Sequence, residues 1–258
     1  MCDPETNAEV VAWHRAHYGH PSVFGYKDLI PLWRAERWDP AALVRTFKQA
    51  GARYIMPVAV HHDNYDNYDS AFQPWNSVHM GPKRDIVDEW RAAALAEGLH
   101  FTVSTHQHES WDWFHREYNF DADGSLAGVP WDGWQTVADG QGKWWQGLDP
   151  GDLYVHHWLP WDPALDVTHH RMRRTNHGDW PGDREILDNA GGVLGTIKVD
   201  PAAQDKFVIN WYLRTKDLID KYHPEMLYID WGLPFAHLPC RDSVWLRLNA
   251  HYYNASLR

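Results

Sequence analysis

Apolar positions at helical spacing alternate with short strand-like runs over much of the chain. Asp39 stands where a helix N-cap is expected, Pro40 occupies the first helical position and Gly51 ends the pattern. The same order of helix and then strand recurs twice, and a final amphipathic stretch predicts one more helix. The helical segments and the runs that follow them are 39–51 then 53–60, 85–97 then 99–105, and 203–222 then 225–229, with the last helix over 243–257.

Repeated helix and buried-strand units predict parallel strands joined by crossover helices, which is an α/β fold of the barrel or doubly wound type. Polar residues follow each predicted strand: 61–63, 106–109 and Asp230. Because active sites of such folds lie at the carboxyl ends of the strands, we expect these three groups to share one site. The stretch 112–198 breaks the rhythm, and we interpret it as a long inserted loop region rather than a separate domain.

The composition excludes several classes of binding partner and favours one class of substrate. The chain has 258 residues with 24 Lys plus Arg, 35 Asp plus Glu and a net charge of -11, which argues against nucleic-acid and anionic-membrane partners. Two cysteines are too few for a disulfide framework, no apolar run approaches a membrane span, and the first residues lack a signal-peptide pattern. The 18 His and 17 Trp suit a carbohydrate cleft, in which flat rings and polar side chains hold the sugar.

The histidines allow a metal interpretation as well. Adjacent His61 and His62 point to opposite sides of a strand unless the strand has already ended, so a shared metal is geometrically awkward. His106 and His108 are two residues apart and would lie on one side of a strand, as a metal pair does. No third ligand for that pair is identifiable from the sequence.

Asp230 is the strongest catalytic candidate because it follows a short apolar run directly. It is either a structural acceptor or the nucleophile of a retaining glycosidase, which requires a second carboxylate roughly 5 Å away. Asp28, Asp63 and Glu109 are possible partners that the sequence does not distinguish.

Seven motifs follow one another along the chain: FGYKDLIP at 24–31, WDP at 38–40, AGARY at 50–54, HHD at 61–63, WNSV at 75–78, GPKRD at 81–85 and YID at 228–230. In this order they resemble the alpha-L-fucosidases of glycoside hydrolase family 29. The resemblance covers residues 18–109 and resumes over 205–253, with no match between them.

The resemblance implies a (β/α)8 TIM-type barrel that removes alpha-linked L-fucose from a glycan with retention of configuration, without a metal or other cofactor. Asp230 matches the family's nucleophile, and His61 and His62 match the paired histidines that bind the sugar. Tyr228 stands where many relatives have Trp beside the sugar. Two looser matches complete the substrate-binding set: His106 at the same pocket and Trp75 in a motif near it.

Departures from the family pattern lead to a further expectation. Residues 1–17 lack the family's His-Trp-Gly signature, and the general acid/base is expected beyond Arg258. We therefore expect 1–258 to be one incomplete barrel domain with an irregular insertion at about 112–198. Open strand edges would make this chain aggregation-prone and inactive alone. The alternatives are a metal-dependent barrel hydrolase using His106, His108 and His61, and a non-catalytic sugar-binding protein.

Overall fold

The computed structural model describes residues 8–114, 117–155, 158, 171–174, 184–188, 190–230 and 241–255. The chain divides into two compact units, and each is described by itself. The first unit combines Met1–Leu29 with Trp111–Phe207, and the second combines Ile30–Ser110 with Val208–Arg258. Within the described residues, no helix is both long and apolar enough to cross a membrane.

The second unit contains the helix and strand repeats expected from the sequence. Its elements are α2 Pro40–Gln49, β1 Tyr54–Ile55, β2 Val58–Val60, α3 Ile86–Ala96, β3 His100–Phe101, β4 Val103–Thr105, η2 Gln107–Glu109, the greater part of α6 Ala203–Tyr222, β8 Leu227–Ile229 and α7 Arg241–Ala255. The side chain of Asp39 accepts a hydrogen bond from Ala42 N, and that of Asp85 accepts one from Asp88 N. Both N-caps satisfy backbone donors at the start of a helix, which confirms the predicted helix starts.

The strands of the second unit are parallel, as predicted. Strand β4 lies between β2 and β8, so the order in the sheet follows the order in the chain, and β1 pairs with β3. The row Val58, Ser104 and Tyr228 runs across the sheet, with Ser104 paired to both neighbours. Each of the first two predicted strands is interrupted, at 56–57 and at Thr102. Pro57 has no N–H for a ladder and accounts for the first break.

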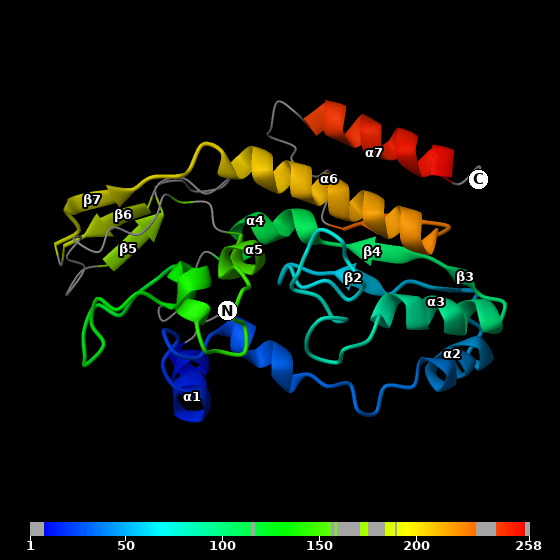
Figure 1. Ribbon diagram of the computed structural model, residues 1–258, viewed down its shortest axis with the longest axis horizontal. Coiled ribbons are helices and arrows are strands. Elements are labelled where there is room, and N and C mark those ends of the chain that lie inside the picture. The colour runs from blue at the N-terminus through cyan, green and yellow to red at the C-terminus, as the bar shows by residue number, and fades with distance from the viewer. Residues whose placement is uncertain are drawn as a thin grey trace. The chain divides into compact units, whose positions relative to one another are not determined.

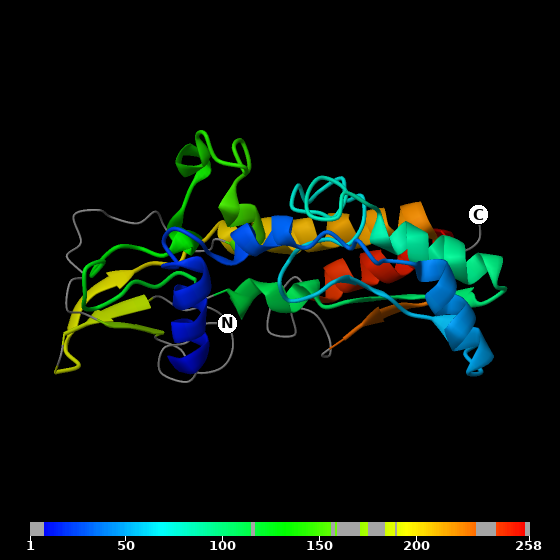
Figure 2. The same cartoon turned by 90° about the horizontal axis from the view of Figure 1, so that it is seen from below.

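Helices α2, α3 and α6 bury their apolar sides against these strands. Figures 1 and 2 show α3 beside the strands of this unit, with α2 next to α3. The shared core consists of Val44, Ile55, Ala59, Tyr68, Val87, Ala93, Ala94, Leu99, Phe101, Val103, Leu218 and Tyr222. On the sheet row described above, Val58 and Tyr228 remain 39% and 47% exposed. The helix side of the sheet is thus packed, and these two side chains lie outside that core.

The first unit is rich in buried aromatic side chains. Its elements are α1 Ala8–Tyr18, part of η1 Tyr26–Leu32, most of α4 Ser110–Trp113, η3 Asp132–Trp134, η4 Val137–Gly140, α5 Pro150–Tyr154, β5 Arg171–Arg174, β6 Arg184–Leu187 and β7 Val193–Ile197. Strands β5, β6 and β7 form an antiparallel sheet inside the stretch where the sequence predicts no regular element. Trp131, Trp145, Trp158, Tyr118 and Tyr154 are almost fully buried.

Candidate active site

The ends of β2, β4 and β8 bring the predicted site residues together. His61 and His62 follow β2 directly, His106 follows β4, and Asp230 follows β8. Backbone hydrogen bonds hold these ends side by side: His106 N donates to Val60 O at 2.9 Å, and Asp230 N donates to Thr105 O at 3.2 Å. The expectation that these strand ends converge is confirmed within the second unit.

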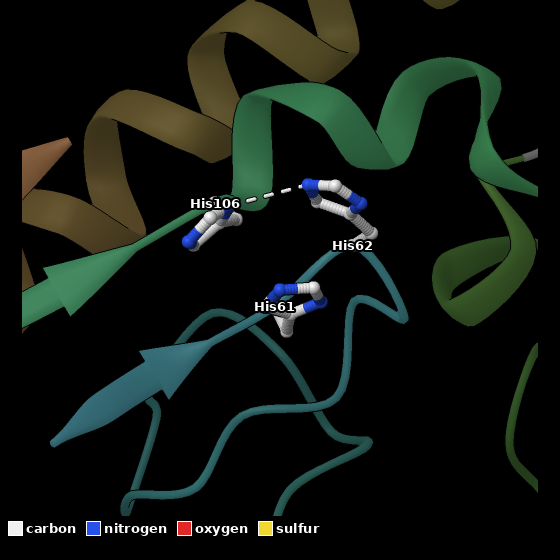
Figure 3. A group of neighbouring side chains, drawn as sticks. All are labelled: His61, His62 and His106. Carbon is white, nitrogen blue, oxygen red and sulfur yellow. Dashed lines mark hydrogen bonds between the residues drawn. The ribbon is translucent and has the colours of Figure 1, made fainter. Parts of the chain in front are cut away.

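The three imidazole rings lie against one another. Figure 3 shows His61 and His62 just past the end of β2 and His106 just past the end of β4. The ring centroids of His61 lie 4.3 Å from His62 and 4.4 Å from His106. Nδ1 of His106 and Nε2 of His62 are 3.2 Å apart, and the three residues offer ligand atoms within 4.8 Å of one another. Because β2 ends at Val60, the alternation that would separate His61 from His62 does not apply.

Asp230 joins this group through one carboxylate oxygen. His106 Nε2 lies 2.9 Å from Asp230 Oδ2, and the Tyr228 hydroxyl donates to Asp230 Oδ1 at 3.3 Å. The side chain of Asp230 is 39% exposed. Both carboxylate oxygens thus contact a neighbour, and the side chain still reaches solvent.

The histidines perturb one another electrostatically. Burial, followed by the nearby His61 and His106, lowers the pKa of His62 to about 4, although Asp230 acts in the opposite direction. Burial and His61 lower the pKa of His106 as well. A neutral imidazole carries one N–H donor and one acceptor nitrogen. At neutral pH, His62 and His106 can therefore both give and accept hydrogen bonds with hydroxyl groups.

A buried ion pair fastens the loop after His62 to helix α6. The Arg214 guanidinium pairs with Asp66, and its Nη1 donates to Asn64 Oδ1 at 2.6 Å. Asn64 has a φ of +59°, a left-handed conformation that asparagine tolerates better than most residues. Sequence reasoning missed Arg214, because no local pattern connects a position in a long helix with a loop about 150 residues earlier.

Two of the candidates are placed differently from the expectation. His108 lies in η2 rather than on an extended strand, so the same-side placement expected from its two-residue spacing to His106 does not apply. Metal binding by this pair was only an alternative interpretation, and it stays one. Burial, followed by His106, lowers the pKa of His108 to about 4. Trp75 is 0% exposed and lies inside the loop that follows β2, where it supports the loop. We therefore leave Trp75 out of the site.

The possible carboxylate partners of Asp230 have contacts of their own. Asp28 belongs to the first unit, where it accepts hydrogen bonds from Lys27 Nζ at 2.8 Å and Trp144 Nε1 at 2.8 Å. Glu109 Oε1 lies 3.2 Å from His108 Nε2. Asp63 follows His62 in the same loop. None of these contacts links a second carboxylate to Asp230, so the residue that would protonate a leaving group is not assigned.

Comparison with known proteins extends the motif resemblance. The family model for alpha-L-fucosidase matches residues 2–255, including 2–17 and 112–198, where the motifs above have no counterpart. Tissue alpha-L-fucosidase of Rattus norvegicus is 32% identical over 123 residues, which are 47% of this chain and 26% of the rat protein. The human tissue enzyme is 31% identical over 103 residues, 40% of this chain and 22% of the human protein. The aligned parts thus span about a quarter of these curated relatives.

Solved structures agree at the level of the fold. The crystal structure of Thermotoga maritima alpha-fucosidase matches with a TM-score of 0.51 and 22% identity, over 94% of this chain and 39% of that one. The structure of the same enzyme in complex with fucose gives a TM-score of 0.53 and 21% identity, over 96% of this chain and 40% of that one. The predicted α/β class is confirmed.

Proposed function

Because the chain belongs to the alpha-L-fucosidase family, we propose that it supplies part of the active site of a glycoside hydrolase that removes alpha-linked L-fucose from glycans. The observation that carries this proposal is the meeting of His61, His62, His106 and Asp230 at the ends of three neighbouring parallel strands. The rat and human relatives are named as fucosidases, and the Thermotoga maritima enzyme was solved with fucose.

The proposed mechanism is double displacement with retention. Asp230 Oδ1 or Oδ2 attacks the anomeric carbon, the bond to the leaving oxygen breaks, and a carboxylic acid not assigned in this chain protonates that oxygen. The covalent fucosyl ester on Asp230 is then hydrolysed by a water that the same acid, now a base, deprotonates. His106 and Tyr228 orient the Asp230 carboxylate in this scheme, and His61 and His62 bind hydroxyl groups of the sugar.

We propose further that the strands form part of a (β/α)8 barrel. Two features support a barrel over a doubly wound sheet. The order β2, β4, β8 follows the chain without reversal, whereas a doubly wound sheet reverses its strand order at a switch point. Helices α2, α3 and α6 also share one core with the strands, as the outer helices of a barrel do.

The described strands also support the proposal that residues 1–258 alone are inactive. Among the described strands, β8 pairs with β4 alone. Strand β2 pairs with β4, and its other side carries no more than an isolated bridge between Val60 and Asp66. Unpaired strand edges and an uncovered face promote association. The test compares residues 1–258 with the longest polypeptide that the coding region encodes. The proposal would be contradicted if residues 1–258 eluted as a monomer from a sizing column and had the same fucosidase turnover as that polypeptide.

The catalytic proposal is tested by Asp230→Gly in that longest polypeptide, called the full-length protein below. We expect hydrolysis of an aryl alpha-L-fucoside to fall by roughly 10⁴-fold, in the range seen when a nucleophile is removed. Added azide should restore turnover and give a fucosyl azide of inverted configuration, because the small anion enters the space left by the carboxylate. Retained hydrolysis by Asp230→Gly would rule out the nucleophile role. Fucose binding by a wild-type protein that hydrolyses no fucoside would instead indicate a sugar-binding protein.

A further inference from the structure

The three histidines of the site have the chemistry and spacing of a metal centre. Imidazole nitrogens suit zinc, copper and nickel rather than magnesium or calcium, which prefer oxygen ligands. His61, His62 and His106 each offer a ring nitrogen, and all these atoms lie within 4.8 Å of one another. In a tetrahedral zinc site with Zn–N distances of about 2.0–2.1 Å, neighbouring nitrogens are about 3.3–3.4 Å apart. His62 Nε2 and His106 Nδ1, at 3.2 Å, already have nearly that separation.

Asp230 supplies the outer contact that metal-bound histidines commonly make. Metal-bound histidine usually donates its second ring N–H to a carboxylate or carbonyl oxygen, which fixes the ring and leaves the other nitrogen bare. His106 Nε2 lies 2.9 Å from Asp230 Oδ2, while its Nδ1 faces His62. When Nε2 carries the proton, Nδ1 presents its lone pair toward His62.

The backbone prepares this geometry before any ion arrives. His106 N donates to Val60 O at 2.9 Å, which fixes the end of β4 against the end of β2. Asn64 N and the Ser110 hydroxyl both donate to His61 O, at 3.1 Å and 3.3 Å. His61 is exposed, so its ring has room to turn toward an ion held by the other two.

We propose that His61, His62 and His106 form a three-histidine site for zinc or a similar divalent transition-metal ion, and that this ion excludes the sugar. The second half rests on the proposed function, in which His61 and His62 bind fucose hydroxyls with the same ring nitrogens. The ion is an inhibitor in this scheme. It occupies the sugar-binding nitrogens, and it holds His106 in the orientation that engages Asp230.

The first experiment measures zinc alone. Calorimetric titration of the tag-free, full-length protein with zinc chloride should give one ion per chain at this site. His62→Gln and His106→Gln should each weaken binding at least tenfold, and Asp230→Asn should weaken it about 10- to 100-fold, as removal of an outer contact does. His100→Gln is the matched control, because His100 is exposed on the same unit and pairs with Glu225 at 2.7 Å.

The outcomes separate this proposal from the proposed function. Unchanged zinc affinity in His62→Gln and His106→Gln would place the ion elsewhere and overturn the site. If a buried variant does not fold by circular dichroism, the exposed His61→Gln serves in its place. Fucose should weaken zinc binding, and zinc should abolish fucoside hydrolysis until a chelator is added. Zinc and fucose binding together without competition would overturn the exclusion. A protein that binds zinc at these histidines but never hydrolyses fucosides would refute the proposed function and leave the metal site standing.

Discussion

Each unit of the chain contains a cluster of ionisable side chains. The cluster is buried in the first unit and partly exposed in the second. In the first unit, Lys27, Glu117, Asp132 and Tyr154 are all buried. Lys27 Nζ contacts Asp132 Oδ2 at 3.3 Å, Lys27 N donates to the Tyr154 hydroxyl at 2.8 Å, and that hydroxyl donates to Asp132. Gly25 leaves room for this group, because a Cβ there would lie 1.8 Å from Asp132 Oδ2. The group in the second unit is half-open: three imidazoles lie together, and one of them, that of His106, contacts the Asp230 carboxylate at 2.9 Å.

This is the difference expected between a structural group and the proposed functional one. Charges sealed in an interior persist only when each has a partner, and removing one partner is strongly destabilising. Imidazoles that lower one another's pKa contribute little to stability, because each disfavours the charged form of its neighbours. Their concentration at the carboxyl ends of the strands supports the proposed binding role, because perturbed groups of this kind cluster at functional sites.

The largest expected effect lies in the sealed group. Lys27→Met removes the cation beside Asp28 and Asp132 and should lower the free energy of unfolding by about 3–5 kcal/mol. Urea denaturation of the full-length protein measures it. Lys48→Met is the control, because its pair with Glu97 is a surface contact worth about 0–1 kcal/mol. Equal losses in the two variants would refute the distinction between sealed and exposed charges.

The sealed group should also make the protein less stable as the pH rises. Burial and the neighbouring Asp132 raise the pKa of Glu117 from 4.5 to about 8. Between pH 4.5 and 8 the folded chain keeps a proton on Glu117 that the unfolded chain has lost. The stability that this proton contributes is fully present below pH 4.5 and is lost as the pH rises through 8. Glu117→Gln removes this dependence, so its stability relative to wild type should increase between pH 4.5 and 8. Parallel stability curves for the two proteins across that interval would contradict the prediction.

The half-open group should have the opposite pH dependence. Because the pKa of His62 falls from 6.5 to about 4, the unfolded chain binds a proton that the folded chain does not. Wild type should therefore lose stability as the pH falls from 6.5 to 4, and His62→Gln should lose less. At pH 7 the same variant should bind fucose about tenfold more weakly, since one hydrogen bond of ~1.4 kcal/mol is lost. Fucose affinity equal to wild type would remove His62 from the sugar site.

Tyr228→Phe should have the smallest effect. It deletes the hydroxyl that donates to Asp230 Oδ1 at 3.3 Å and keeps the ring. We expect kcat/KM for an aryl fucoside to fall by at most about tenfold, the equivalent of roughly 0.5–1.5 kcal/mol. A loss as large as that of Asp230→Gly would mean that the hydroxyl takes part directly in the chemistry.

Local sequence signals predicted the second unit well. Asp39 with Pro40 located the start of α2, Asp85 that of α3, and the spacing of Phe207, Trp211 and Leu218 predicted α6, because caps and helical periodicity are short-range properties. The convergence of the strand ends followed from the rule for parallel sheets. The roles of His61 and His62 came from the family resemblance, since spacing alone left them open.

Helix caps and periodicity could not predict features that depend on contacts between distant parts of the chain. The end of β4 at Thr105 was predicted, but the metal interpretation of His106 and His108 assumed extended backbone there instead of the turn η2. The pairing of Arg214 with Asp66, the burial of Trp75 and the sheet of β5, β6 and β7 depend on contacts between distant or weakly patterned segments. Tertiary packing decides such features and overrides local propensity.

The most direct test of the central claim is to identify the residue that becomes bonded to the sugar. The full-length protein is incubated with a 2-fluoro fucosyl fluoride, whose fluorine slows hydrolysis of the glycosyl ester, and is then digested and analysed by mass spectrometry. We predict one fluorofucosyl group per chain, carried by the peptide that contains Asp230 and absent from Asp230→Asn. A label on another carboxylate, such as Asp63 or Glu109, or continued turnover without any label, would contradict the assignment of Asp230 as the nucleophile.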